Sequence, residues 1–319
     1  MYEKFYGFSE KPFNTTPDSK FFFPSQKHTE ALNSLLYAIA EKKGFVVITG
    51  EIGSGKTTIT RALLNKLDGN TKAALITNTH LNQKELITQI LEELEVEYIP
   101  GGKQKLLSQL NAYLIKQLAQ DINTVLIIDE AQNLTPKVIE EVRMLSNLET
   151  EKEKLIQIIL LGQPQLKAKL QNPKLEQFKQ RIALYYHLSG LDRGETEAYI
   201  LHRLKLVSAN GVHYFNQKAI DTIYAYSRGI PRLINLISDS ALLSGYICDS
   251  RQITENIISA AIKERELGDI TNDINQKLYC CLNCQEDRTC VTKWIRGTKG
   301  EEQLCCPLCK KYLSCKEAK

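Results

Sequence analysis

FVVITGEIGSGKTT, residues 45–58, decides the fold of this 319-residue chain. Its β-branched start predicts a strand over residues 45–49, and the pattern from Ile59 to Leu67 predicts a helix. A glycine-rich loop therefore joins a strand to a helix, which is the context that a GxxxxGK[ST] phosphate loop needs. Its glycines let backbone N–H groups face a polyphosphate at the helix N-terminus. The predicted nucleotide-contacting residues are Gly50, Glu51, Ile52, Gly53, Ser54, Gly55, Lys56, Thr57 and Thr58.

A second element supports the phosphate loop. The apolar run VLII at residues 125–128 is followed by Asp129 and Glu130. Lys56 can reach the β- and γ-phosphates of a nucleotide, and the Thr57 hydroxyl can ligate Mg²⁺. Asp129 is expected to hold the water shell of the Mg²⁺, and Glu130 to polarise the attacking water. The alternative is an ordinary buried strand capped by acids. Together the two motifs predict that the chain binds ATP with Mg²⁺ and hydrolyses it.

Composition narrows the class of protein. A hydrophobic content of 43% suits a soluble core, and no run approaches the roughly 18 apolar residues of a membrane helix. The start, MYEKFYGFSEKPF, is unlike a signal peptide. We therefore expect a cytoplasmic protein without a membrane segment, whose nine cysteines do not form disulfides. The formal net charge of +4 arises in residues 277–319, where nine Lys and Arg stand against five Asp and Glu.

The order of predicted elements indicates an α/β fold. A helix is expected from about Gln26, and strands over residues 73–77, 155–161 and 182–188 alternate with helices over 83–94, 103–118 and 135–148. Thr135-Pro136 is a typical helix start, with Thr as the cap and Pro in the first turn. Alternation of this kind predicts a parallel sheet that binds ligands at its carboxyl edge.

After Asp192 the pattern becomes helical, with helices expected over residues 195–207, 217–227, 231–247 and 254–266. The layout of an α/β core followed by a small helical bundle is that of AAA+ ATPases. The aromatic, proline-punctuated N-terminus is expected to be an extended arm packed across a domain surface. The predicted divisions are an arm (1–27), a nucleotide-binding core (28–190), a helical lid (191–267), a linker (268–279) and a cysteine-rich tail (280–319).

Residues 1 to about 267 resemble the bacterial AAA+ ATPases of the general secretion pathway protein A type, the ExeA-like family. The resemblance rests on YEKFYGFSEKPFNTTPDSKFFF, HTEALNSLLYAI, GEIGSGKTT, LIIDEAQNL, LLGQPQL, QRI, YHLSGL and GIPRLIN. It implies a P-loop NTPase core with a C-terminal lid, and assembly into a ring or filament of identical chains. Relatives of this module also regulate DNA transposition, where they polymerise on DNA.

The resemblance implies roles for three further residues. Gln163 matches a polar residue that senses the γ-phosphate, although it is also suited to the turn before Pro164. Arg181 matches an arginine finger that acts on the nucleotide of a neighbouring subunit, and the alternative is a surface residue of a charged helix. Arg232 matches the lid arginine called sensor two, and the alternative is a cap of its own helix.

The cysteines form an internal repeat. Cys280, Cys281, Cys284 and Cys290 recur 25 positions later as Cys305, Cys306, Cys309 and Cys315. The spacing C-x₂-C-x₂₁-C-x₂-C of Cys281, Cys284, Cys306 and Cys309 is typical of a zinc ribbon. The four flanking cysteines either form a second site or shift the register, and Fe–S ligation or redox-active thiols are the alternatives to Zn²⁺. Cys248 is expected to be a core residue.

The tail departs from the secretion members, which continue into a membrane helix and a peptidoglycan-binding domain. We expect neither here. The zinc module either has a purely structural role, binds nucleic acid through residues such as Lys293 and Trp294, or holds a protein partner. The preferred hypothesis is an oligomeric ATPase associated with DNA, of the transposition or mobile-element type. The alternatives are an assembly or motor ATPase of a secretion or pilus envelope system, and a nucleotide-gated adaptor with little turnover.

Overall fold

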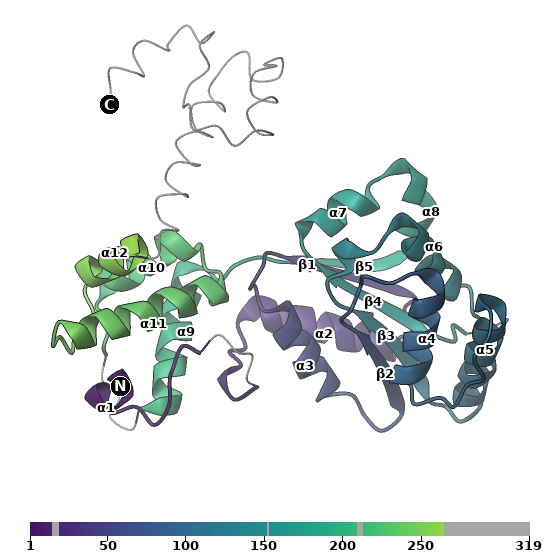
Figure 1. Cartoon of the computed structure of the whole chain (residues 1–319), viewed down its shortest axis with the longest axis horizontal. Helices are drawn as coiled ribbons and strands as arrows, with labels where there is room; N and C mark the ends of the chain where they lie inside the picture. The colour runs from purple at the N-terminus through teal and green to yellow at the C-terminus, as the bar shows by residue number, and fades with distance from the viewer. Residues whose placement is uncertain (15–18, 152, 209–212, 265–319) are drawn as a thin grey trace, which may run out of the picture. The chain divides into compact units, whose positions relative to one another are not determined.

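The computed structural model describes residues 1–14, 19–151, 153–208 and 213–264 (Figure 1). The chain divides into two compact units, Met1–Glu255 and Asn256–Lys319, and only residues 256–264 of the second are described. The predicted linker and cysteine-rich tail therefore lie outside the described residues.

The described part of the first unit is built on a five-stranded parallel sheet (Figure 1). Its order is β2-β3-β4-β1-β5, and every neighbouring pair runs in the same direction. Strands β1 and β4 are buried along their whole length, as expected for inner strands covered by helices on both faces. The strands are β1 (Phe45–Gly50), β2 (Thr71–Ile76), β3 (Asn123–Ile128), β4 (Gln157–Gly162) and β5 (Ile182–Leu188).

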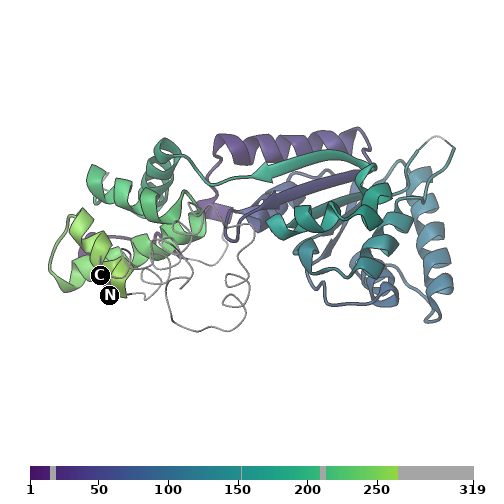
Figure 2. The same cartoon turned by 90° about the horizontal axis from the view of Figure 1, so that it is seen from above.

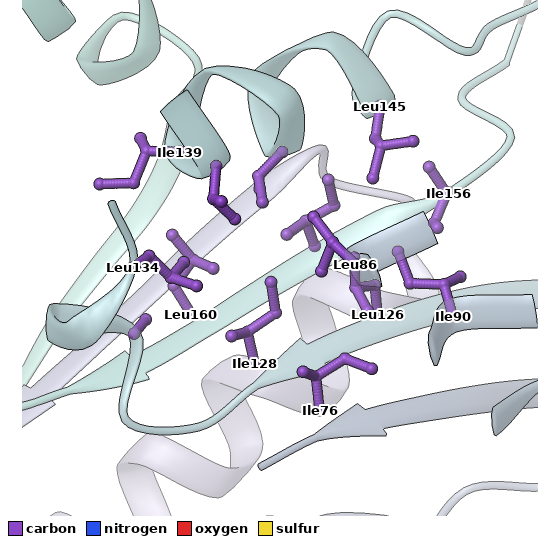
Figure 3. Packing of buried hydrophobic residues seen from close by; sticks show 14 of the residues in the cluster. Ile76, Leu86, Ile90, Leu126, Ile128, Leu134, Ile139, Leu145, Ile156 and Leu160 are labelled. Atoms are coloured by element: carbon purple, nitrogen blue, oxygen red, sulfur yellow. The ribbon is translucent and has the colours of Figure 1, made fainter. Parts of the chain in front are cut away.

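Helices cover both faces of the sheet, and alternate residues of each strand supply the two cores. Leu126 and Ile128 belong to one core, with apolar residues of five helices, part of which Figure 3 shows. Those helices are α4 (Gln83–Glu93), α5 (Lys103–Ala119), α6 (Pro136–Leu145), α7 (Pro164–Leu170) and α8 (Glu176–Lys179). Val125 and Ile127 face the other core, with apolar residues of α2 (Gln26–Ala40) and α3 (Lys56–Leu64).

Local sequence explains where these helices begin. Thr135 accepts a hydrogen bond from the Val138 N–H and Pro136 occupies the first turn of α6, as predicted. Asn82 and Glu85 form a capping box at the start of α4. Helix α2, purple in the view from above, runs alongside β5 (Figure 2), where the Tyr186 hydroxyl donates to the Lys27 carbonyl at 3.1 Å. The short 3₁₀ helices are η1 (Ser19–Phe21), η2 (Ala131–Asn133) and η3 (Pro173–Leu175).

The segment after the sheet is helical, as predicted. Helix α9 begins with a capping box of Asp192 and Glu195, and Asn216 caps α10. The helices are α9 (Arg193–Val207), α10 (Gln217–Ser227), α11 (Pro231–Ile247) and α12 (Glu255–Glu264). The division between the two units falls at the first residue of α12.

The N-terminal arm is not fully extended, and in this respect the prediction is wrong. Residues Tyr2–Tyr6 form a short helix, α1, which ends at Gly7 in the left-handed conformation (φ 75°). A five-residue helix is too short to show a periodic pattern in the sequence. The arm is held to the lid by hydrogen bonds, because the Tyr6 hydroxyl donates to the Ser250 carbonyl at 3.0 Å and the Tyr214 hydroxyl donates to the Tyr6 carbonyl at 2.6 Å.

Candidate functional site: a phosphate loop between the sheet and the lid

The phosphate loop is closely surrounded by other segments. Gly53 and Gly55 have φ angles of +80° and +100°, a conformation that residues with a side chain rarely adopt. A Cβ at Gly53 would lie 2.3 Å from Cβ of Arg232, and one at Gly55 would lie 2.6 Å from Nε2 of His28. The loop therefore needs glycine at both positions for its own curvature and for the approach of its neighbours.

Lys56 lies inside this loop. Its side chain is buried, and Nζ donates to the carbonyl oxygens of Gly50 at 2.8 Å and Glu51 at 3.0 Å. Burial lowers the pKa of the Lys56 ammonium, and the nearby carboxylates of Glu130 and Asp129 oppose that shift. The nearby carboxylates thus offset only part of the effect of burial on the Lys56 ammonium, and a bound polyphosphate would supply further negative charge that stabilises it.

Thr57 and Asp129 meet although 72 residues separate them in the sequence. The Thr57 hydroxyl donates to Oδ2 of Asp129 at 3.1 Å, and the Glu130 N–H donates to Oδ1 of the same carboxylate at 2.8 Å. Hydroxyl and carboxylate oxygens are the hard donors that Mg²⁺ prefers. These two side chains fit the predicted magnesium site at the end of β3.

Glu130 has two amide partners. Nε2 of Gln163 donates to its Oε2 at 3.1 Å, and Nε2 of Gln132 donates to the same oxygen. Oε1 of Gln132 in turn accepts from the Gln163 N–H at 2.9 Å. The structure thus brings together Glu130 and Gln163, both named from the sequence, and adds Gln132, which the sequence analysis missed. Its position two residues after Glu130 gave only a weak hint, because its other partner, Gln163, lies 31 positions further along the sequence.

A cavity of about 390 Å³ opens beside the loop. Lys56, Thr57 and Glu130 line it, together with residues from the arm and the lid. Arg232 lines it too, and its backbone N–H donates to the Gly53 carbonyl at 3.2 Å. Among the residues that the structure describes, the Arg232 guanidinium forms no ion pair. A cation of the lid therefore borders the same space as the phosphate loop.

Two side chains that the sequence analysis did not single out complete the wall of this cavity. The first is His28, which places Nε2 at 2.9 Å from the Ser54 carbonyl and Nδ1 at 2.6 Å from Oγ of Ser25. Burial lowers the pKa of His28, which favours the neutral ring, and because a carbonyl only accepts, Nε2–H is the donor in this hydrogen bond. His28 thereby connects α2 to the loop.

The second is Arg203, which connects the lid to the arm. The side chain is buried, with Nε donating to the Pro12 carbonyl at 2.6 Å and Nη1 to the Tyr199 hydroxyl at 2.7 Å. The Tyr199 hydroxyl donates to Oδ1 of Asn235 at 2.9 Å, and the Arg203 guanidinium lies 4.6 Å from the centre of the Phe21 ring. No local sequence pattern marks such a residue, because its partners are up to 191 positions away.

Arg181 is not part of this cavity. It immediately precedes β5, whose last residue, Leu188, pairs with Gly50 at the other end of the strand. Seven extended residues span roughly 20 Å. Nη1 of Arg181 donates to Oγ of Ser146 at 2.9 Å and to Oδ1 of Asn147. Arg181 therefore lies at the opposite end of the sheet from the phosphate loop of its own chain.

The predicted zinc ligands, from Cys280 to Cys315, lie outside the described residues. Cys248 is described, and the expectation that it is a core residue is wrong. It is exposed and is the C-cap residue of α11. The helix ends just before it, so Cys248 does not extend the apolar face of the helix. In the described ranges no helix combines the length and the apolar character needed to cross a membrane.

Comparisons with known proteins identify a domain family and a relative for this chain. A family model described as an AAA domain matches residues 39–170. General secretion pathway protein A of Aeromonas hydrophila is 42% identical over 265 residues, which is 83% of this chain and 48% of that protein. The chain thus spans about half the length of the curated relative it matches.

Solved structures share the fold at low sequence identity. Drosophila ORC bound to DNA has a TM-score of 0.62 at 15% identity, covering 86% of this chain and 67% of that one. The Aeropyrum pernix ORC1 protein in complex with DNA has a TM-score of 0.60 at 13% identity, covering 93% and 84%. Cdc6p from Pyrobaculum aerophilum has a TM-score of 0.59 at 19% identity, covering 78% and 71%. Residues 39–170 are an AAA domain, and the chain resembles general secretion pathway protein A over 83% of its length, as its sequence motifs predict.

Proposed function

We propose that this chain binds ATP with Mg²⁺ at the phosphate loop and hydrolyses it. The observation that carries the proposal is the contact of Thr57 with Asp129 beside the buried ammonium of Lys56. The phosphate loop and the acids after β3, two motifs far apart in the sequence, thus meet at one cavity. Bound Mg²⁺ would supply positive charge to the β- and γ-phosphates, with Thr57 and Asp129 as its holders.

In this proposal each further side chain has one task. Lys56 exchanges its bonds to the loop carbonyls for bonds to the phosphates, since its ammonium already lies in the loop. Glu130 accepts a proton from the attacking water. Gln163 senses the γ-phosphate and couples its presence to Glu130, because the Gln163 amide already donates a hydrogen bond to that carboxylate. Arg232 contributes positive charge from the lid.

We further propose that Arg181 acts on the nucleotide of a neighbouring copy. Arg181 lies at the far end of β5 from the phosphate loop of its own chain, so it cannot act on a nucleotide in its own cavity. An arginine supplied by a neighbouring subunit stabilises the charge of the transition state. Activity then requires assembly of identical chains into a ring or filament.

The comparisons favour an envelope-assembly role over the DNA-associated role that the sequence analysis preferred. The relative at 42% identity is named for the general secretion pathway, whereas the DNA-bound proteins share only the fold, at 13% and 15% identity. We therefore propose an assembly or motor ATPase whose partner is a protein of a secretion system. Zinc binding by the cysteine segment remains a prediction, with partner recruitment as its proposed role.

Two variants test the chemistry of the site. Lys56→Ala should abolish binding of a fluorescent ATP analogue, because the loop loses its buried cation. Glu130→Gln should keep that binding and lower turnover by about 100-fold, since an amide of the same size cannot accept the proton. Equal loss of binding in both variants would contradict the role given to Glu130.

A DNA-binding assay at two salt concentrations tests the identity of the partner. Binding to DNA that weakens steeply between 50 and about 200 mM salt would favour the DNA-associated hypothesis over the envelope-assembly role.

A further inference from the structure

The amide of Gln132 joins two elements of the site. It lies in η2, directly after Glu130 and Ala131, and its donor end meets Oε2 of Glu130. Its acceptor end meets the backbone N–H of Gln163, at the end of β4, at 2.9 Å. A carboxylate accepts only, and a backbone N–H donates only. The chemistry of the partners therefore fixes the orientation of this amide.

The surroundings make room for this contact and reinforce it. A Cβ at Gly162 would lie 2.9 Å from Oε1 of Gln132, so glycine at the end of β4 leaves space for the amide. Nζ of Lys169, on α7, donates to the backbone carbonyls of Gln132 and of Leu134, the latter at 2.8 Å. The segment β4–α7 is thus tied to η2 through both the side chain and the backbone of Gln132.

The two amides leave half of the Glu130 carboxylate available. Both hydrogen bonds to the Glu130 side chain, from Gln132 and from Gln163, go to Oε2. Within the described residues Oε1 accepts no hydrogen bond from a side chain, and Glu130 lines the cavity. A carboxylate that acts as a base must reach the water with one oxygen. Hydrogen bonds to the other oxygen hold the group in the orientation that this requires.

We propose that Gln132 is a positioning residue that fixes the carboxylate of Glu130 and links it to the end of β4. This inference rests on the proposed function, since it assigns a task relative to Glu130. A displacement of Gln163 moves the acceptor end of the Gln132 amide, and the donor end then turns the Glu130 carboxylate. Gln132 is not among the residues that line the cavity, so its action is through Glu130.

The test compares two substitutions of Gln132 with matched changes at Gln165, an exposed glutamine on α7. Gln132→Met keeps the length of the side chain and removes both hydrogen bonds. We expect kcat for ATP to fall about tenfold or more, with the affinity for an ATP analogue unchanged to within about twofold. Gln165→Met should leave both quantities at the level of the unaltered protein.

Gln132→Glu keeps the shape of the side chain but replaces the amide donor by a carboxylate, which cannot donate to Oε2 of Glu130. We expect kcat to fall about tenfold or more, with the affinity for an ATP analogue unchanged to within about twofold. A residue that only supported the fold would lower binding and turnover together, and Gln165→Glu serves as the control for added charge.

The outcomes separate this inference from the proposed function. If Glu130→Gln retains full turnover, the proposed base is wrong. If Glu130→Gln is inactive while Gln132→Met and Gln132→Glu both keep kcat, the positioning role alone is overturned. Should Gln132→Met unfold, which thermal unfolding would reveal, the kcat and the nucleotide affinity of Gln132→Glu provide the test.

Discussion

A single methyl group at Gly53 would disturb the phosphate loop in two ways. The φ angle of +80° costs roughly 1–2 kcal/mol for a residue with a Cβ, and that Cβ would lie 2.3 Å from the Cβ of Arg232. The clash involves the first carbon of a side chain at the start of α11, so a change of rotamer cannot relieve it. The loop and the first turn of the lid helix would have to move apart.

Gly53→Ala should therefore weaken binding of an ATP analogue by about tenfold or more, since about 1.4 kcal/mol corresponds to one factor of ten. Fluorescence titration measures this effect. Gly69→Ala is the matched control, because a Cβ at Gly69 meets nothing within 4 Å and its φ is not in the left-handed region. Equal affinities of the two variants would show that the approach of α11 to the loop is unimportant for binding.

Among the elements, α9 has a structural task that its sequence does not reveal. Arg203 of this helix supplies donors to the Pro12 carbonyl of the arm and to the Tyr199 hydroxyl. Arg203→Met would keep most of the buried volume and leave these acceptors without their donor. Each such loss costs about 1–3 kcal/mol.

Unfolding by urea should therefore show a loss of about 2–4 kcal/mol in the free energy of unfolding for Arg203→Met. Arg251→Met is the control, because the exposed Arg251 guanidinium lies 5.4 Å from the centre of the Phe5 ring and such a contact contributes at most about 1 kcal/mol. If the two losses were the same, the hydrogen bonds of Arg203 would not hold the arm to the lid.

Elements with strong local signals were predictable. The bounds of α10, α11 and β5 coincide with the predicted ones, because Asn216 and Pro231 mark helix starts and β5 is a compact apolar run. The parallel sheet followed from the alternation of strands and helices. The placement of the glycine-rich loop after β1 and of Asp129 after β3 was predictable from the spacing of the two motifs, and the roles of these residues toward a nucleotide stay predictions.

Contacts between distant segments were not predictable. Helix α1 has too few residues for a periodic pattern, and Cys248 was assigned to the core because the helix before it is apolar. Gln132 and Arg203 contribute through partners that only the folded chain brings near. A single sequence holds no record of such pairs, whereas caps and phosphate loops are local.

For the molecule as a whole, the position of Arg181 predicts an activity that depends on assembly. Arg181→Ala should keep the affinity for nucleotide and lose turnover by about tenfold or more. A steady-state assay over a range of protein concentrations checks this, since specific activity of the unaltered chain should rise with concentration.

Mixing two inactive variants provides the sharper control. Lys56→Ala keeps Arg181 but lacks a working loop, and Arg181→Ala keeps the loop but lacks the arginine. A mixture should regain part of the turnover that neither has alone, because one copy completes the site of the other. Full turnover of Arg181→Ala by itself, independent of concentration, would mean that each chain has a self-contained site.

Strand β5 links the two places at which a chain would take part in hydrolysis. Its last residue pairs with Gly50, where the phosphate loop starts, and its first residue follows Arg181. A hydrogen-bonded strand resists stretching, so a small axial displacement at one end arrives almost undiminished at the other. If neighbouring copies contact one another through Arg181, the loss of a γ-phosphate in one copy would be transmitted mechanically to the next. Hydrolysis would then pass from copy to copy in sequence, and the direction of travel would be set by the polarity of one strand.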